Sequence, residues 1–407
     1  MKILIVADVY PPEVSSAANL MQELAQGLKK RSHKITVVTS YPRHYLTEAL
    51  KGKKFQIFSD EGGIDVIRIK VLPHHKVNFI IRGISQLILP FLFFAKIKKF
   101  IKQIDAVIVY SPPLPLALVG GMIKKKYGAK FILNIQDIFP QNAIDLGILK
   151  GWKHKPAVWL FEWLEKKIYK EADKITFHSE GGRKFLIDKK EVPENKIITL
   201  PNWIDLAPYQ NLTSDISFRK QYGLEGKFIF LFAGIMGPAQ GLDFLMEVAK
   251  KVSDLKDVVF LLVGDGMEKE KIEKLIGNYG LKNVIIKPFV SKDEYPYLVK
   301  DADVGLVCLS PNNKTPFVPG KFLGYLAAAK PALAFLNKES DGFALTNEAG
   351  CGYAVPSDNL EEAVRIIKKM HAERNKLSQF GQNGFVYAKN NLSLKVCLDK
   401  IEKLLNS

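Results

Sequence analysis

Residues 228–243, FIFLFAGIMGPAQGLD, run from a short apolar segment through a turn with three glycines into a stretch of helical periodicity. Short apolar runs recur along the chain between helical stretches, which is the pattern of parallel strands buried under crossover helices. The predicted strands are 3–6, 35–38, 66–69, 106–109, 131–134 and 174–177, followed by 228–232, 258–263, 284–286, 304–307, 332–335 and 352–355. The pattern predicts two doubly wound α/β sheets.

The chain length of 407 residues also favours two domains, because one hydrophobic core seldom supports so many residues. The segment LPNWIDLAPYQNLTSDIS, which starts at residue 200, carries prolines, asparagines and serines without sustained periodicity, as a linker does. We therefore expect a first domain at 1–205, a second at 206–391, and a ligand cleft between them. The amphipathic segment at 392–407 is expected to pack back on the first domain.

The net charge of +17 and the pI near 9.4 indicate an anionic partner. Cys308, Cys351 and Cys397 lie far apart, so neither a disulfide framework nor a zinc site is expected, and a reducing cytoplasm fits best. The opening MKILIVADVY contains a polar Asp8 and lacks a small-residue cleavage site after it, which favours a buried strand over a signal peptide.

The segment from Lys76 to Lys102 is unlike the rest of the chain, because a long uncharged stretch is followed by clustered lysines. Thirteen uncharged residues lie between Arg82 and Lys96, too few for the ~20 that cross a bilayer, and Pro90 is expected to interrupt them. Four lysines follow, at 96, 98, 99 and 102, so the segment fits an anionic membrane surface, with a core helix as the alternative. For Trp152, Trp159 and Trp163, core packing is favoured over contact with lipid or acceptor.

Two strand-to-helix turns are candidate ligand sites, because ligands of doubly wound sheets bind at the carboxyl ends of strands. The first turn, ADVYPPEVSSAA, includes Glu13, Ser15 and Ser16. It contains no G-x-G-x-x-G, so dinucleotide binding loses its main support. The two serines either contact a ligand on the acceptor side or simply cap the helix.

The second turn contains Gly234, Gly237 and Gly241, which let a backbone approach a phosphate at the start of a helix. LLVGDGMEKE at 261–270 ends another strand at the same edge, and TPFVPGKFLGYLAAAKP at 315–331 brings Lys321 to the start of a further helix. A lysine there would be a point charge for an anionic group, although most lysines are simply exposed.

The order of these motifs resembles the glycosyltransferases of the GT-B fold, family GT4, over nearly the whole chain. The resemblance rests on DVYPPEVSSAA, SHKITVVTSYP, NIQDIFPQNAIDLGILKG, HSEGGRKFL with LPNWID, FAGIMGPAQGLDFLMEVA, LLVGDGMEKEKIEKL, DADVGLVCLSPNN, VPGKFLGYLAAAKPALA and EAGCGYAVPSDN. Within GT4 the chain looks most like bacterial surface-polysaccharide N-acetylfucosamine and N-acetylglucosamine transferases.

The resemblance implies two Rossmann-like domains, a UDP-sugar bound by the second, an acceptor bound by the first, and transfer with retention and without a metal. The donor-binding residues it implies are Gly237, Pro238, Gln240, Gly264, Gly266, Pro319, Gly320 and Lys321. The chain also departs from the family. Pro316 and Gly324 stand where many members have two glutamates, and Ile235 and Gln240 replace an arginine and a lysine. Lys321 is therefore the best candidate for diphosphate binding.

Asp137, just after a first-domain strand, is the candidate that orients or deprotonates an acceptor hydroxyl. A turn cap before Pro140 is the structural alternative for Asp137, and Glu13 is an alternative base. Other polar residues have structural interpretations: Asp301 and Asp303 as a turn instead of a metal-binding pair, His33 at a helix end, and His178 packed after a strand.

Three functions remain possible from the sequence. The first is a retaining glycosyltransferase, peripheral on the inner face of the cell membrane, that moves a sugar of the N-acetylated hexosamine type from a UDP-sugar to a polyprenyl-diphosphate-linked saccharide in O-antigen or capsule synthesis. The second is a UDP-sugar 2-epimerase, which has no need of a membrane segment. The third is a non-catalytic basic protein that binds lipid or nucleic acid. Nucleic acid is not expected as a partner, because the lysines are dispersed and no binding module is present.

Overall fold

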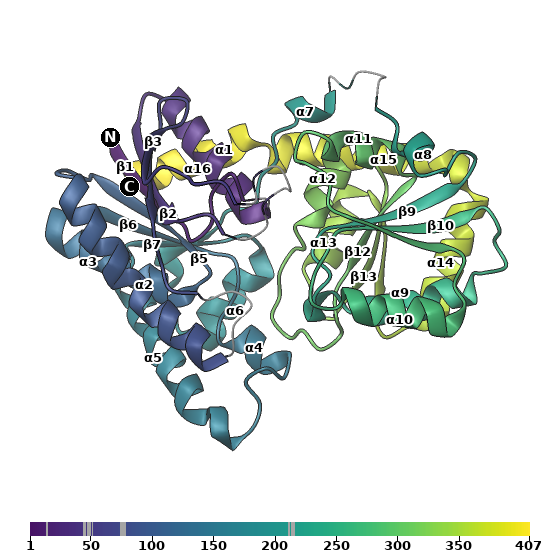
Figure 1. The fold of residues 1–407 in the computed structure, drawn as a ribbon, viewed down its shortest axis with the longest axis horizontal. Coiled ribbons are helices and arrows are strands. Elements are labelled where there is room, and N and C mark those ends of the chain that lie inside the picture. The colour runs from purple at the N-terminus through teal and green to yellow at the C-terminus, as the bar shows by residue number, and fades with distance from the viewer. Residues whose placement is uncertain are drawn as a thin grey trace. The chain divides into compact units, whose positions relative to one another are not determined.

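The computed structural model describes residues 1–13, 15–43, 46, 50, 52–73, 79–210, 212 and 216–407. The chain folds into two compact units (Figure 1). The first unit comprises Met1–Pro201 together with Leu394–Ser407, and the second comprises Asn202–Ser393. The chain thus leaves the first unit once and returns to it for its last helix.

The first unit is built on an eight-stranded sheet in the order β3-β4-β2-β1-β5-β6-β7-β8. All neighbouring strands are parallel except β3, which is antiparallel to β4. The strands are β1 (Lys2–Val6), β2 (Lys34–Ser40), β3 (Phe58–Asp60), β4 (Asp65–Ile69), β5 (Ala106–Ser111), β6 (Lys130–Ile135), β7 (Lys174–Phe177) and β8 (Ile197–Thr199).

Helices cover this sheet, and their ends carry local signals. Ser15 accepts a hydrogen bond from the Ala18 amide and caps α1, and Ser179 caps α6 in the same way through Gly182. The helices and short helical turns are α1 (Ser16–Lys30), α2 (Phe79–Phe100), η2 (Leu114–Ala117), α3 (Leu118–Tyr127), α4 (Gln141–Asp145), η3 (Trp152–His154), α5 (Lys155–Glu171), α6 (Glu180–Lys190), η4 (Glu194–Lys196) and α16 (Leu394–Asn406).

The second unit is built on six parallel strands in the order β11-β10-β9-β12-β13-β14, which is the 3-2-1-4-5-6 order of a Rossmann-type sheet. The order reverses between β9 and β12, so their carboxyl ends flank the switch point where such sheets bind ligands. The strands are β9 (Phe228–Ala233), β10 (Val258–Val263), β11 (Val284–Lys287), β12 (Val304–Cys308), β13 (Ala332–Leu336) and β14 (Gly352–Pro356).

Alternate residues of β9 supply the two apolar layers of the second unit. Phe228, Phe230 and Phe232 enter one layer, and Ile229, Leu231 and Ala233 enter the other. The layers are covered by α7 (Ala207–Gln210), α8 (Phe218–Gln221), η5 (Pro238–Gln240), α9 (Leu242–Lys251), α10 (Lys269–Tyr279), α11 (Tyr295–Asp301), α12 (Lys321–Ala327), α13 (Gly342–Ala349), α14 (Leu360–Ala372), η6 (Arg374–Lys376), α15 (Leu377–Tyr387) and η7 (Ala388–Leu392).

The final helix, α16, belongs to the first unit and packs on α1. Arg31 at the end of α1 pairs with Glu402 at 2.6 Å and with Asp399 at 2.5 Å, and His33 lies 3.3 Å from Glu402. Gly27 makes room for Leu398, since a Cβ atom at residue 27 would overlap the leucine side chain.

The two predicted sheets are confirmed, and each predicted strand overlaps a strand of the structure. The prediction for Pro90 was wrong. Pro90 lies inside one continuous helix, α2, which buries Leu89, Phe93 and Ile97 along one face. Lys76 lies outside the described residues. In the part of the chain that is described, no helix is long and apolar enough to cross a membrane.

Candidate functional site

Two glycine turns interlock at the carboxyl ends of β9 and β10. The Gly234 amide donates to the Val263 carbonyl at 2.9 Å, and the Met236 amide donates to the Asp265 carbonyl at 2.8 Å. A Cβ atom at Gly264 would clash with the Gly234 carbonyl oxygen. A Cβ atom at Gly266 would likewise clash with the Met236 carbonyl oxygen. These glycines are therefore needed for one turn to pack on the other, whatever ligand the turns bind.

The predicted residues Gly237, Pro238 and Gln240 form the short turn η5 after β9. The Gln240 side-chain oxygen accepts from the Gly237 amide at 3.0 Å, and the Gln240 amide donates to the Gly237 carbonyl at 3.0 Å. The Gly237 amide is thus already bonded within the turn, and a phosphate oxygen there would have to displace Gln240. Gly241 ends the turn with a φ of 56°.

The loop after β12 is tied to this turn. The Ser310 amide donates to the Ala239 carbonyl at 2.8 Å, and the Asn313 side-chain amide donates to the same oxygen at 3.3 Å. The loops on the two sides of the switch point are therefore held together, as a preorganised ligand site requires.

Lys321, the first residue of α12, is half-buried beside the Gly234 turn. Its ammonium lies 4.6 Å from the centroid of the Phe232 ring. A Cβ atom at residue 234 would lie 3.0 Å from the lysine Cε atom, so the glycine leaves space for this side chain. Within the part of the chain that the structure describes, Lys321 forms no ion pair or hydrogen bond through its ammonium.

Burial lowers the pKa of Lys321 to about 8, because a poorly hydrated site disfavours the ammonium. The neighbouring Cys308 thiol has its pKa raised to about 12, also by burial, and so stays neutral. Lys321 is consequently a cation to which the described residues supply no counter-charge. Pro319 and Gly320 lead into α12, and the Pro319 carbonyl accepts from the Phe322 amide at 3.3 Å.

The structure gives a physical reason for one departure from the family pattern. Gly324 is buried against Tyr295, and a Cβ atom at residue 324 would lie 2.6 Å from the tyrosine hydroxyl. The hydroxyl occupies the space that a side chain at 324 would need. Tyr295 was not among the predicted site residues, because its proximity to Gly324 depends on the packing of α11 against α12.

In the first unit, Asp137 follows β6 and is exposed to solvent at the carboxyl edge of the sheet. Surrounding protein nevertheless reduces its hydration and raises its pKa. Tyr110, at the end of β5, was not predicted as a site residue; burial and the Asp137 carboxylate raise the pKa of its phenol. Tyr110 is thus a neutral hydroxyl close to the candidate base.

His178 supports the loop that carries Asp137. Its Nε2 atom lies 3.2 Å from the Gln136 carbonyl, and its ring stacks on Phe177 with 4.6 Å between centroids. Burial lowers the pKa of His178 to about 4, so the ring is neutral at physiological pH and Nε2 donates to that carbonyl. The expectation of a packed, hydrogen-bonded histidine agrees with this geometry.

The acceptor-side residues Glu13, Ser15 and Ser16 lie after β1, at the same edge as Asp137. Glu13 is buried, and its carboxylate accepts from the Arg43 amide at 3.1 Å. Ser15 is engaged as the cap of α1, whereas Ser16 is exposed. Glu13 thus holds the loop after β2, and of the two serines Ser16 presents its side chain to solvent.

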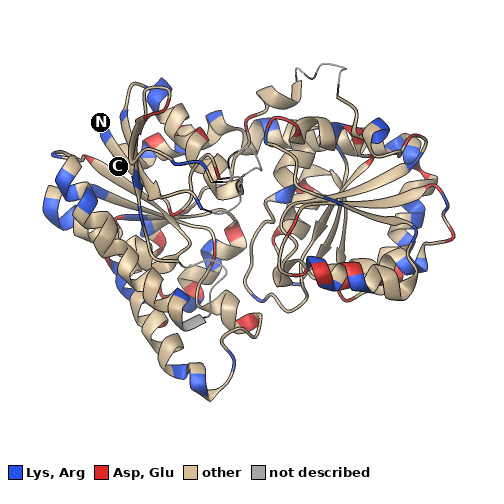
Figure 2. Ribbon diagram, in the orientation of Figure 1, with Lys and Arg blue, Asp and Glu red and all other residues tan. Residues whose placement is uncertain are grey.

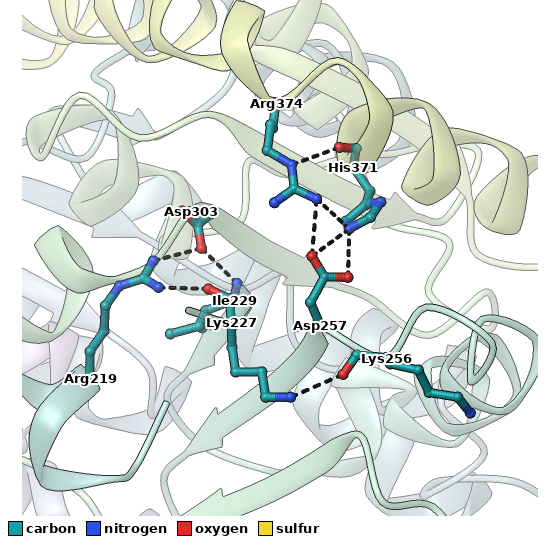
Figure 3. Close-up of polar contacts among 8 residues, drawn as sticks. All are labelled: Arg219, Lys227, Ile229, Lys256, Asp257, Asp303, His371 and Arg374. Carbon is teal, nitrogen blue, oxygen red and sulfur yellow. Dashed lines mark hydrogen bonds and ion pairs between the residues drawn. The ribbon is translucent and has the colours of Figure 1, made fainter. Parts of the chain in front are cut away.

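The Asp301 and Asp303 pair lies at the opposite, amino edge of the second sheet. Figure 3 shows Asp303 with its partners Arg219 and Ile229. Asp303 accepts from Arg219 at 2.6 Å and from the Ile229 amide at 2.7 Å, and Asp301 accepts from the Arg219 amide at 3.0 Å. Among the described residues, no cluster of His, Cys, Asp or Glu could hold a metal ion. The interpretation of this pair as structural agrees with these contacts.

The preference for core packing of three tryptophans was wrong. Trp159 is 68% exposed and Trp163 50%, because the opposite side of α5 faces the core. Trp152 is 75% exposed and lies on η3, which has no buried residue.

The chain has two Rossmann-type sheets, and the second has glycine turns and a lysine at its switch point. This combination defines an α/β protein of the GT-B class. Solved structures agree at the level of fold. The sucrose-phosphate synthase of Thermosynechococcus elongatus matches with a TM-score of 0.78 at 14% identity, over 100% of this chain and 98% of that one. Anabaena HepE, in complex with UDP, matches with a TM-score of 0.71 at 17% identity over 100% of each chain.

Two family models together match most of the chain: Glycosyltransferase Family 4 at residues 17–208 and Glycosyl transferases group 1 at residues 214–386. The chain therefore belongs to the family 4, group 1 glycosyltransferases, as the resemblance of its motifs indicated. The "Putative colanic acid biosynthesis glycosyl transferase WcaI" of Escherichia coli K12 is 26% identical over 82% of this chain and 83% of its own length. The "Probable glycosyltransferase WbjE" of Pseudomonas aeruginosa is 25% identical over 73% of each.

Proposed function

We propose that this glycosyltransferase moves a sugar, of the N-acetylated hexosamine type, from a UDP-sugar to a polyprenyl-diphosphate-linked saccharide, with retention and without a metal. The reaction would take place at the cytoplasmic face of the membrane in surface-polysaccharide synthesis. Support comes from the name of the E. coli relative, which refers to colanic acid biosynthesis, and from the HepE complexes with UDP and UDP-glucose.

The observation that carries the proposal is the ammonium of Lys321 beside the Gly234 turn, with which no acidic side chain of the described residues pairs. Breaking the bond between sugar and diphosphate builds negative charge on the departing UDP. A cation already held in place without a protein counter-charge stabilises that charge without first breaking an ion pair. Lys321 therefore acts on the leaving group in this proposal.

Asp137 is assigned to the acceptor. Its raised pKa makes the carboxylate a better proton acceptor than an ordinary aspartate, and its exposure lets a sugar hydroxyl reach it. In this role it orients the acceptor hydroxyl and takes its proton as the new glycosidic bond forms.

The donor is tested by a thermal-shift screen of nucleotide sugars, since a ligand of the native state raises its apparent stability. We expect UDP-N-acetylhexosamines to raise the melting temperature of the native enzyme, with a much smaller rise for Lys321→Ala. Lys300→Ala, at an exposed site on α11, is the matched control and should respond like the native protein. Equal rises for native protein and Lys321→Ala would contradict the role of the lysine.

The reaction is tested by incubation with UDP-sugar, with and without a lipid-linked saccharide. Transfer should require the acceptor, and NMR of the product should show the anomeric configuration of the donor. Asp137→Asn should lower turnover by about 10²-fold or more while the donor-induced thermal shift stays, with the exposed Asp188→Asn as control. Formation of an epimeric UDP-sugar without acceptor would instead establish the epimerase.

A further inference from the structure

Three of the four tryptophans are exposed within twelve residues of the first unit and are here called the tryptophan face: Trp152, Trp159 and Trp163. On α5, at about 100° per residue, Trp159 and Trp163 lie about 40° apart on one side of the helix. Trp152 lies on η3, the turn that leads directly into α5. The fourth, Trp203, is only 2% exposed.

The opposite side of α5 anchors the helix. Phe161, Leu164 and Ile168 are buried, and buried Glu165 accepts from Lys190 at 2.9 Å and from Tyr169 at 3.0 Å. The orientation of α5 is therefore set by its own core contacts. The tryptophan face is left in solvent by a firmly packed helix, and its exposure does not depend on a mobile segment.

The residues around the tryptophan face are strongly basic. Over the described stretch 150–170, Glu162 is the one exposed acidic residue, against six exposed lysines at 150, 153, 155, 166, 167 and 170. Lys153 lies 5.8 Å from the Trp152 ring centroid and Lys167 lies 5.4 Å from that of Trp163. Figure 2 shows Lys and Arg along α5 and the neighbouring α3.

We propose that the tryptophan face docks this enzyme on an anionic bilayer, with the indole rings in the headgroup layer and the lysines on lipid phosphates. Indole rings favour the membrane interface because one edge is apolar and the N–H is polar. The surrounding positive charge complements anionic lipid and disfavours a basic protein partner. α2 also exposes apolar side chains, among them Ile84 and Phe91, but it contains no tryptophan and buries its central face in the core. In this proposal α5 and η3 therefore supply the inserting indole rings.

This inference rests on the proposed function, because a lipid-linked acceptor calls for an enzyme bound to the membrane. Docking is nevertheless measured without turnover, so the two can fail separately. The assay is flotation with phosphatidylcholine vesicles that contain phosphatidylglycerol. Replacing all three tryptophans with alanine should weaken binding by about tenfold or more, because each indole buries a large apolar area. The matched control, Ile84→Ala with Phe91→Ala on α2, should keep most of the binding.

The lysines are tested separately. Replacement of Lys153, Lys155 and Lys167 by glutamine should weaken binding about tenfold or more to anionic vesicles, and should change little with phosphatidylcholine alone. Lys166 is left in place because it pairs with Glu191 at 2.9 Å.

Tryptophan emission is a second measurement that reports on the rings directly. Anionic vesicles should shift the emission of the native protein to shorter wavelength, while buried Trp203 contributes a constant background. The triple alanine variant should show no shift. Unchanged melting temperature of the variant, and unchanged transfer to a water-soluble acceptor, would show that fold and catalytic site are intact.

Two results would overturn the proposal. Equal flotation of native protein and triple alanine variant, with loss only in the α2 variant, would assign docking to α2. A native dimer that the triple variant converts to monomers, with no emission shift on vesicles, would assign the tryptophan face to a second copy of this chain. If the native protein floats with vesicles as expected but binds no UDP-sugar, that result would count against the proposed function and not against docking.

Discussion

The ammonium of Lys321 lies 4.6 Å from the ring centroid of Phe232, the fifth residue of β9. This contact holds the lysine against the apolar end of the strand, where burial lowers its pKa to about 8. The lysine is charged below that pH and becomes neutral as the pH rises through it. A bound diphosphate stabilises the charged form, so binding is favoured at the lower pH.

We therefore predict that the affinity for a UDP-sugar falls as the pH rises through about 8. Lys321→Arg should keep its affinity across this range, because a guanidinium stays protonated. Lys321→Met should bind weakly at every pH. Calorimetric titrations of the three proteins check this, and an affinity that is equally independent of pH in native protein and Lys321→Arg would exclude Lys321 from donor binding.

Gly264→Ala should destabilise the second unit by about 2 kcal/mol or more, because its Cβ atom would overlap the Gly234 carbonyl and push the two glycine turns apart. Donor binding should be lost with it. Gly277→Ala, on α10 of the same unit, is the matched control, since a Cβ atom there meets nothing within 4 Å. Urea titrations and thermal shifts with UDP-sugar measure both effects, and equal behaviour of the two variants would show that the turns adapt.

Asp257, His371 and Arg374 form a hydrogen-bonded cluster at the amino edge of the second sheet. This cluster predicts that the second unit becomes less stable in acid. Hydrogen bonds from His371 and then Arg374 lower the pKa of Asp257 from 3.8 to about 2 (Figure 3). The stabilisation is therefore complete above pH 3.8 and is lost as the pH falls through about 2. Asp257→Asn should cost up to about 1 kcal/mol at neutral pH, a modest value because the carboxylate is partly exposed.

Urea titrations at several pH values provide the measurement for Asp257→Asn. The difference from the native protein should disappear in strong acid. Asp293→Asn, at an exposed site in the same unit, is the control and should leave stability unchanged at all pH values. A loss for Asp257→Asn that persists at the acid end would point to packing instead of charge.

Leu398→Ala on α16 should lower the stability of the first unit by about 2–4 kcal/mol, because the leucine is buried against Gly27 and leaves a cavity. The exposed Lys395→Ala is the control on the same helix. Hydrogen exchange resolves the units, and slower-exchanging amides of β9 and β10 should be unaffected. Destabilisation spread equally over both units would contradict the assignment of α16 to the first.

The sequence predicted the central strands because strands buried on both faces read as continuous Val, Ile and Leu runs. β3 and β8 were missed because each has only three residues, and β3 contains polar Ser59 and Asp60. The tryptophans were misassigned because α5 is apolar on two sides, and periodicity alone does not say which side faces the sheet.

The candidate site could be predicted from the sequence only in part. Glycines after strands are visible in a sequence, but the packing of Gly264 on Gly234 depends on β9 and β10 being neighbours. The proximity of Tyr295 to Gly324 and the influence of Asp137 on Tyr110 likewise join residues that lie far apart or on different strands. Such relationships follow from tertiary packing and leave no local pattern.

The return of α16 to the first unit makes the second unit an insertion within it. A chain truncated after residue 393 would contain every residue of the second unit but none of α16. In such a chain α1 lacks the partner that covers Gly27 and neutralises Arg31. We therefore expect the loss of the last fourteen residues to destabilise the unit that is formed mostly by the first half of the chain, and to spare the unit that directly precedes the cut.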